Sequence, residues 1–186
     1  QSGVGRTGRM WACEHSGVRP DIMTSAKGLG SGMPIGAIVA RKTIMEQWKR
    51  GAHGNTFGGN PLSCAAAIAT LDLVQSEYAA NAARVGEHFM GRLREMQRDY
   101  PCIGEVRGRG LMIGMELIEN DAERTPARAL CDRLVTRGYH NGLLLLSCGV
   151  STLRFMPPLS TTIAEIDEAI GLLRTALDEA LQGKGA

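Results

Sequence analysis

The longest regular pattern of apolar and polar positions lies in the middle of the chain, over residues 78–100. Apolar side chains recur there every three or four residues, with charged and polar residues between them. This spacing places the apolar side chains on one face of a helix, and Pro101 ends the pattern because proline cannot continue a helix. The face consists of Val85, Phe89, Leu93 and Met96. The pattern therefore predicts one long helix with a buried stripe.

Short apolar strands alternate with amphipathic helices after this point. A helix is predicted from Pro126, with Gly138 as its C-terminal stop, and a capping box of Thr162 and Glu165 opens a last helix. Strands are predicted at residues 103–106, 111–118, 143–147 and 152–155. Because strands and helices alternate, we expect an α/β or α+β domain over residues 81–186.

The first eighty residues are rich in glycine and predict shorter elements. Residues 1–21 indicate a loop with one short helical turn. The elements expected next are strands at 21–24 and 35–40 and helices at 43–50 and 62–75. The second strand is apolar on both faces, which suits the middle of a sheet. Asn60 and Pro61 form a helix start. We place a domain boundary near residue 80.

Composition and charge narrow the class of protein. The chain has 186 residues, of which 44% are hydrophobic and 22% charged, and its net charge is +2. This is the composition of an ordinary globular protein. Basic residues are interleaved with acidic ones and only 4% of residues are aromatic, which argues against nucleic-acid binding.

The cysteines and the lengths of the apolar runs indicate the cellular compartment of the protein. Five widely spaced cysteines without a CxxC pair favour a reducing compartment over a disulfide framework, and neither they nor the four scattered histidines suggest a metal site. The sequence has no apolar run long enough to span a membrane and no secretory leader. We therefore expect a cytoplasmic protein that binds neither membranes nor metals.

Three stretches carry candidate chemistry, and each also has a plain structural interpretation. Lys27 opens a glycine-rich run, residues 25–36, that is either a turn beside a solvated lysine or a cofactor site. A second glycine-rich loop, residues 51–61, holds Thr56 and is either a connection or a phosphate-binding loop. Arg154 lies in an apolar strand, where it either points to solvent or pairs with an anion.

The residue order in these three stretches resembles the motifs of one family. Ser-Ala-Lys-Gly-Leu-Gly-Ser-Gly-Met-Pro-Ile-Gly around Lys27, His-Gly-Asn-Thr-Phe-Gly-Gly-Asn-Pro around Thr56 and Leu-Arg-Phe-Met-Pro-Pro-Leu around Arg154 are similar to motifs of class III pyridoxal-phosphate aminotransferases. That group includes 4-aminobutyrate, ornithine and acetylornithine aminotransferases. The opening Gln-Ser-Gly-Val-Gly-Arg-Thr-Gly matches the segment that follows the family's Asp-Glu-Val motif.

The resemblance implies a role for each of four residues. Lys27 is the Schiff-base lysine of pyridoxal 5'-phosphate, and Gln1 contacts the phenolic oxygen of that cofactor. Thr56 binds the cofactor phosphate of the neighbouring subunit, which implies a homodimer with shared active sites. Arg154 binds the substrate carboxylate through two parallel hydrogen bonds from its guanidinium. The implied reaction moves an amino group from an amino acid, with an ω-amino acid such as 4-aminobutyrate as the nearest match, to a 2-oxo acid.

The resemblance also implies the fold and the extent of the chain. The fold is that of fold-type I pyridoxal-phosphate transferases, an α/β fold. Residues 1–80 are the C-terminal part of the cofactor-binding large domain with its parallel sheet, and residues 81–186 are the small domain. The family's aspartate for the pyridinium nitrogen would precede Gln1, so we expect a fragment that is inactive by itself. Two alternatives remain: an aminomutase or other class III enzyme, and a non-catalytic remnant that serves only assembly.

Overall fold

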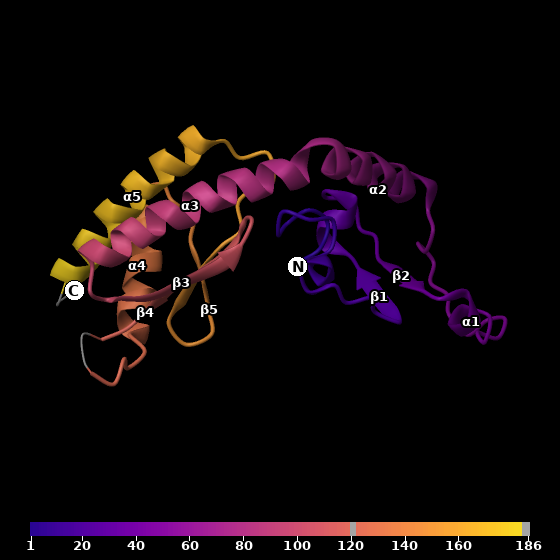
Figure 1. Cartoon of the computed structure of the whole chain (residues 1–186), viewed down its shortest axis with the longest axis horizontal. Coiled ribbons are helices and arrows are strands. Elements are labelled where there is room, and N and C mark those ends of the chain that lie inside the picture. The colour runs from indigo at the N-terminus through magenta and orange to yellow at the C-terminus, as the bar shows by residue number, and fades with distance from the viewer. Residues whose placement is uncertain (120–121, 184–186) are drawn as a thin grey trace. The chain divides into compact units, whose positions relative to one another are not determined.

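The chain forms two compact units, Gln1–Ala80 and Asn81–Ala186, in a computed structural model that describes residues 1–119 and 122–183 (Figure 1). The elements of the first unit are η1 (Ala12–Ser16), β1 (Ile22–Ser25), η2 (Lys27–Gly30), β2 (Ala37–Ala40), α1 (Lys42–Met45), α2 (Pro61–Leu73) and η3 (Val74–Tyr78). Those that follow are α3 (Ala79–Asp99), β3 (Ile103–Arg109), β4 (Met112–Leu117), α4 (Arg128–His140), β5 (Leu146–Cys148), β6 (Thr152–Phe155) and α5 (Ile163–Gln182). None of the helices in the described residues is long and apolar enough to cross a membrane.

The second unit is a sheet with helices packed on one of its faces. The strands run in the order β3-β4-β6-β5, and every pair is antiparallel. Along β4 every second side chain is buried, which is the pattern of a sheet with one covered face. The covering core includes the predicted stripe of α3, and the rings of Phe89 and Phe155 meet edge to face with centroids 5.1 Å apart.

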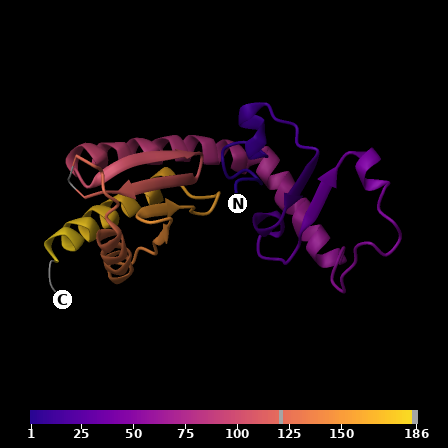
Figure 2. The same cartoon turned by 90° about the horizontal axis from the view of Figure 1, so that it is seen from below.

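Helices α3 and α5 lie side by side and run in the same direction (Figures 1 and 2). Polar pairs mark their contact: His88 with Asp167 at 2.8 Å, and Tyr100 with Asp178 at 2.9 Å. Burial, followed by the bond to Asp178, raises the pKa of the Tyr100 hydroxyl. The predicted capping box is present, since Thr162 Oγ1 accepts from the backbone N–H of Glu165 and the Glu165 carboxylate accepts from the backbone N–H of Thr162.

The first unit contains a two-stranded sheet in which β1 and β2 pair antiparallel from Ile22 opposite Ala40 to Ser25 opposite Ala37. The parallel sheet expected for residues 1–80 is therefore not formed by the strands described here. A parallel pair needs a crossover of roughly a dozen residues or more, usually with a helix, and the short connection between these strands holds only the turn η2. Apolar side chains of both strands, including Ile22 and Val39, remain exposed.

A close backbone contact holds α3 against the β3–β4 connection. Gly86 is buried on α3, and a Cβ atom built there would overlap the backbone carbonyl of Gly110. Gly91, one and a half turns further along the same helix, has nothing within 4 Å of the same position. The absence of a side chain at Gly86 therefore lets helix and sheet approach.

We predict opposite effects of the same substitution at these two glycines. Gly86→Ala should lower the free energy of unfolding by about 1–3 kcal/mol, because the added methyl group would push the backbone of α3 away from that of Gly110. Gly91→Ala should raise it by about 0.5–1 kcal/mol, because alanine has the better helix propensity. Urea unfolding of both variants measures this. Equal effects at the two positions would contradict the close contact.

Candidate functional site

The turn that carries Lys27 is strained. Lys27 lies two residues after the end of β1 and has a φ of 55°, and Ser31, four residues later, has a φ of 44°. Non-glycine residues rarely adopt this left-handed conformation, and each instance costs about 1–3 kcal/mol. Strain of this kind persists only where the surroundings hold it, and it concentrates at functional sites. The Lys27 side chain itself is exposed on the described unit.

Helix α2 supports this turn from one side. Leu29 and Gly30 are buried, Leu29 with only 5% exposure, and η2 packs against α2. The Thr70 hydroxyl of α2 lies 3.0 Å from the Ser31 hydroxyl. A second support comes from within the turn, since a Cβ at Gly30 would overlap the Ile35 side chain. The turn is thus held by apolar packing, by its own backbone hydrogen bonds and by the side-chain contact of Ser31 with Thr70.

The loop that carries Thr56 is attached to the start of the same helix. Asn60 caps α2 by accepting from the backbone N–H of Ser63 at 2.9 Å, as the sequence predicts. The same side chain donates from Nδ2 to the carbonyl of Phe57 at 3.0 Å. Asn60 therefore connects the helix start to the residue after Thr56. Thr56 is exposed, and so is Phe57.

Gln1 opens a tightly wound loop. Val4 is buried with a φ of 51°, an unusual conformation for a β-branched residue, and the N–H of Gly5 donates to the carbonyl of Met10 at 3.2 Å. Burial lowers the pKa of the Arg6 guanidinium. Gln1 itself is exposed at the edge of this loop.

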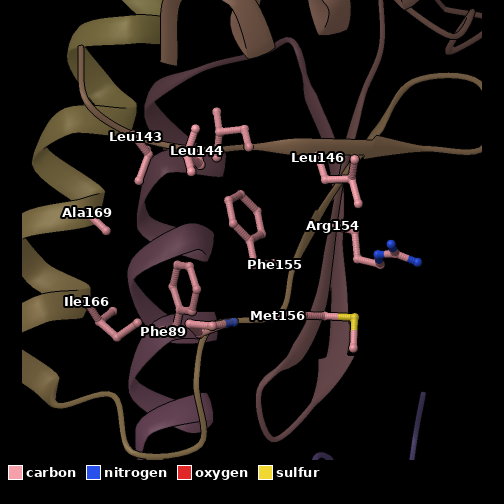
Figure 3. A pocket seen from close by; sticks show the side chains of 11 residues that line it. Phe89, Leu143, Leu144, Leu146, Arg154, Phe155, Met156, Ile166 and Ala169 are labelled. Atoms are coloured by element: carbon pink, nitrogen blue, oxygen red, sulfur yellow. The ribbon is translucent and has the colours of Figure 1, made fainter. Parts of the chain in front are cut away.

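Arg154 belongs to the second unit and occupies the face of the sheet opposite the helices. Its neighbours in β6, Leu153 and Phe155, are buried, whereas Arg154 is half-buried. Figure 3 shows the guanidinium directed away from the rings of Phe89 and Phe155. In register, Arg154 lies beside Gly114 of β4 on one side and opposite Leu146 of β5 on the other.

A pocket of about 270 Å³ adjoins Arg154. Its lining is largely apolar and comes from α3, α5, β6 and the segment that leads into β5 (Figure 3). Arg154 is among the lining residues, and its guanidinium is the charged group of an otherwise largely apolar set. It is directed away from the rings of Phe89 and Phe155 (Figure 3).

The structure brings some of the four predicted site residues onto one support. Lys27 and Thr56 lie on two loops of the first unit that are both attached to α2, and Gln1 lies in the same unit. Arg154 lies in the second unit. Sequence reasoning missed the contact of Thr70 with Ser31, since 39 positions separate the two residues and no local pattern links them.

Comparison with known proteins defines the class of this chain. A family model described as aminotransferase class-III matches residues 1–177, and the chain belongs to that family. It is 44% identical over 180 residues to an acetylornithine aminotransferase of Caldanaerobacter subterraneus, and 37% identical over 182 residues to the 5-aminovalerate aminotransferase DavT of Pseudomonas aeruginosa. Each alignment covers 96% of this chain but 43% of the relative. The chain thus spans about two fifths of their length.

The fold agrees with the same class. The structure of an Arthrobacter phospholyase in complex with phosphoethanolamine matches 96% of this chain and 43% of its own, with a TM-score of 0.90 and 36% sequence identity. The predicted fold-type I transferase architecture is therefore confirmed. Class III aminotransferases depend on pyridoxal 5'-phosphate, so the described residues can be tested for their fit to it.

The chain's own groups fit that cofactor. A primary amine at Lys27 suits an aldehyde, and a hydroxyl within a glycine-rich loop at Thr56 suits a phosphate. Space is available beside both, because a Cβ atom built at Gly28 or at Gly54 would have no neighbour within 4 Å in the described residues. The strained backbone at Lys27 adds independent support, since it fixes the direction in which the side chain leaves the turn.

Proposed function

We propose that this chain is part of an aminotransferase that moves an amino group from an amino acid to a 2-oxo acid with bound pyridoxal 5'-phosphate. The observation that carries the proposal is the strained turn at Lys27, which family membership alone does not provide. In this proposal residues 1–80 belong to the cofactor-binding domain and residues 81–186 form the small domain.

In this proposal each of the four site residues has a definite task. When bound, the cofactor acts as an electron sink that weakens bonds at the amino-bearing carbon of the substrate. Lys27 would hold the cofactor through its Nζ. The same amine, once free, would take the proton from the amino-bearing carbon of the substrate and deliver it to the cofactor carbon. Gln1 orients the ring through its side-chain amide. The hydroxyl of Thr56 and the open backbone of its loop hold phosphate.

Arg154 defines the class of amino donor. A guanidinium offers two parallel N–H donors to one carboxylate. Arg154 is paired with Gly114 on one side and with Leu146 on the other, so of these two cross-strand neighbours Leu146 alone has a side chain beside it. The names of the two curated relatives, acetylornithine and 5-aminovalerate aminotransferase, both denote donors with an amine far from a carboxylate. We therefore propose a donor of this ω-amino type, a class that includes 4-aminobutyrate.

A homodimer with shared sites is part of the proposal. Asn60, the N-cap of α2, secures the loop of Thr56, and Thr70, ten residues further along, contacts the turn of Lys27. The two loops are therefore attached about 15 Å apart along the helix axis. This separation supports an arrangement in which Thr56 serves the cofactor of a second copy and Lys27 serves that of its own chain. Each site then needs both chains.

A cytoplasmic location completes the proposal. All five cysteines are free thiols in the structure. Burial raises the pKa of the Cys102 and Cys131 thiols, which keeps them protonated and unreactive. A protein with this many unpaired cysteines suits a reducing compartment.

A second reaction within the family has one observation in its favour. The phospholyase that matches this fold is named for a different chemistry, so the fold and a cofactor lysine are compatible with more than amino transfer. Consumption of a 2-oxo acid in step with the amino donor distinguishes the two reactions. A lyase or mutase leaves the 2-oxo acid unchanged.

Lys27 should be the point of covalent cofactor attachment. Borohydride reduction of the full-length holoenzyme, followed by peptide mass mapping, should place the pyridoxyl group on Lys27. Among the lysines that the structure describes, Lys27 alone opens a strained glycine-rich turn. Lys42 and Lys49 serve as internal controls in the same digest. A label on either of them instead would contradict the assignment.

Arg154→Lys in the full-length enzyme should weaken donors that carry a carboxylate and leave simple amines nearly unaffected. Lysine cannot reproduce the planar two-bond fork, and a lost charge-assisted hydrogen bond is worth about 1.5–3 kcal/mol, or roughly ten- to a hundredfold in affinity. Steady-state kinetics with an ω-amino acid and its decarboxylated amine provide the measurement. Equal losses for the two donors would show that Arg154 does not bind the carboxylate.

Complementation between two inactive subunits should reveal the shared site. Co-folding full-length Lys27→Ala with Thr56→Ala gives hybrid dimers in which one site lacks both groups and the other keeps both. At limiting cofactor, where the loss of a phosphate contact worth about 1.5–3 kcal/mol is visible, the mixture should exceed either variant alone. If Thr56 serves its own chain, no site keeps both groups and the mixture should average the two.

A further inference from the structure

We infer that Thr70 is a positioning residue for Lys27, acting through Ser31 and through the turn between them. This inference deepens the proposed function and rests on it, because it assigns to α2 the task of holding the cofactor lysine in place. Thr70 itself touches neither Lys27 nor, by this account, the cofactor.

The contact joins two parts of the first unit that are distant in sequence. Thr70 is 8% exposed, and its hydroxyl lies 2.8 Å from the carbonyl oxygen of Ala66 and 3.0 Å from the hydroxyl of Ser31. A hydroxyl has one proton and two lone pairs. It satisfies both contacts when it donates to Ala66 and accepts from Ser31. The exposed Ser31 is thereby tied to Thr70, a buried residue of α2.

The turn depends on such a contact because its backbone is strained at both ends. Lys27 and Ser31 have φ values of 55° and 44°, and neither residue has the freedom of glycine. A relaxed backbone would move both residues toward negative φ and would swing the lysine side chain. Burial of Leu29 holds the middle of the turn, but apolar packing is not directional. The hydrogen bond to Thr70 supplies a fixed direction at the Ser31 end.

The other end of the turn is fixed by the sheet. Ser25, two residues before Lys27, pairs with Ala37 of β2 at the end of the ladder. Lys27 therefore lies between two anchors, the β1–β2 pairing and the contact of Ser31 with Thr70. Removal of one anchor frees the strained residues while the core of the unit stays packed. Loss of the contact with Thr70 should therefore change cofactor binding at Lys27 more than it changes the overall stability.

The test uses three variants of the full-length holoenzyme. Thr70→Val removes the hydroxyl and keeps the shape, and Thr70→Ser keeps the hydroxyl. Thr175→Val is the matched control, because Thr175 also bonds back to a carbonyl of its own helix, that of Gly171, and has no partner outside that helix in the described residues. The readouts are the Kd of pyridoxal 5'-phosphate for the apoenzyme, the pH midpoint of the bound cofactor's visible absorption, and the melting temperature.

Thr70→Val should raise the cofactor Kd about three- to tenfold, the effect expected from one neutral hydrogen bond, and should shift the pH midpoint. Thr70→Ser should restore both, and Thr175→Val should change neither. Ser31→Ala removes the other partner from an exposed turn, and it should reproduce the effect if Thr70→Val fails to fold. A lower melting temperature with unchanged Kd and midpoint would overturn the inference. A wild-type enzyme without a pyridoxyl label on Lys27 would overturn the proposed function, and the inference with it.

Discussion

The first unit depends on the packing of one helix against one strained turn. Leu29 is buried in η2, which packs against α2, and Ser31 contacts Thr70. Together these contacts hold backbone angles that the chain would otherwise leave. The same helix begins at Asn60, whose side chain secures the loop of Thr56. Two glycine-rich loops that look independent in the sequence therefore share a rigid support.

Local patterns predicted the second unit well because its elements obey simple periodicities. The α3 stripe is buried at each predicted position, and the capping box of Thr162 and Glu165 forms as expected. Boundaries were less accurate where tertiary contacts decide them. Gly138, predicted as a helix stop, lies inside α4, and a side chain there would overlap Leu145. This glycine reflects close packing, which a one-dimensional pattern does not distinguish from a helix end.

The first unit was harder to predict for a related reason. The strand at residues 35–40 is apolar on both faces, which suits the middle of a sheet, and the family resemblance implied a parallel one. In the structure β2 pairs antiparallel with β1, because the connection is too short for a crossover. The helix predicted at residues 43–50 is shorter, ending at Met45. Family motifs pointed to Lys27, Thr56, Gln1 and Arg154 as site residues without geometry, and their roles stay predictions. The strain at Lys27 and its support by Thr70 required coordinates, because they depend on backbone angles and long-range contacts.

The glycine beside Arg154 has a consequence for how the donor range of such an enzyme changes over evolution. Gly114 lies next to Arg154 in the sheet, and a Cβ atom there would press on Thr152 at 3.3 Å and lie 3.9 Å from Arg107. Arg107 is already held by Glu105 at 2.7 Å. If Arg154 binds the substrate carboxylate as proposed, a lineage can change the reach of its guanidinium through neighbours on β4 and β5 while the arginine stays. A change in preferred substrate length would then need no loss of charge, and the intermediate sequences would keep the group that binds carboxylates.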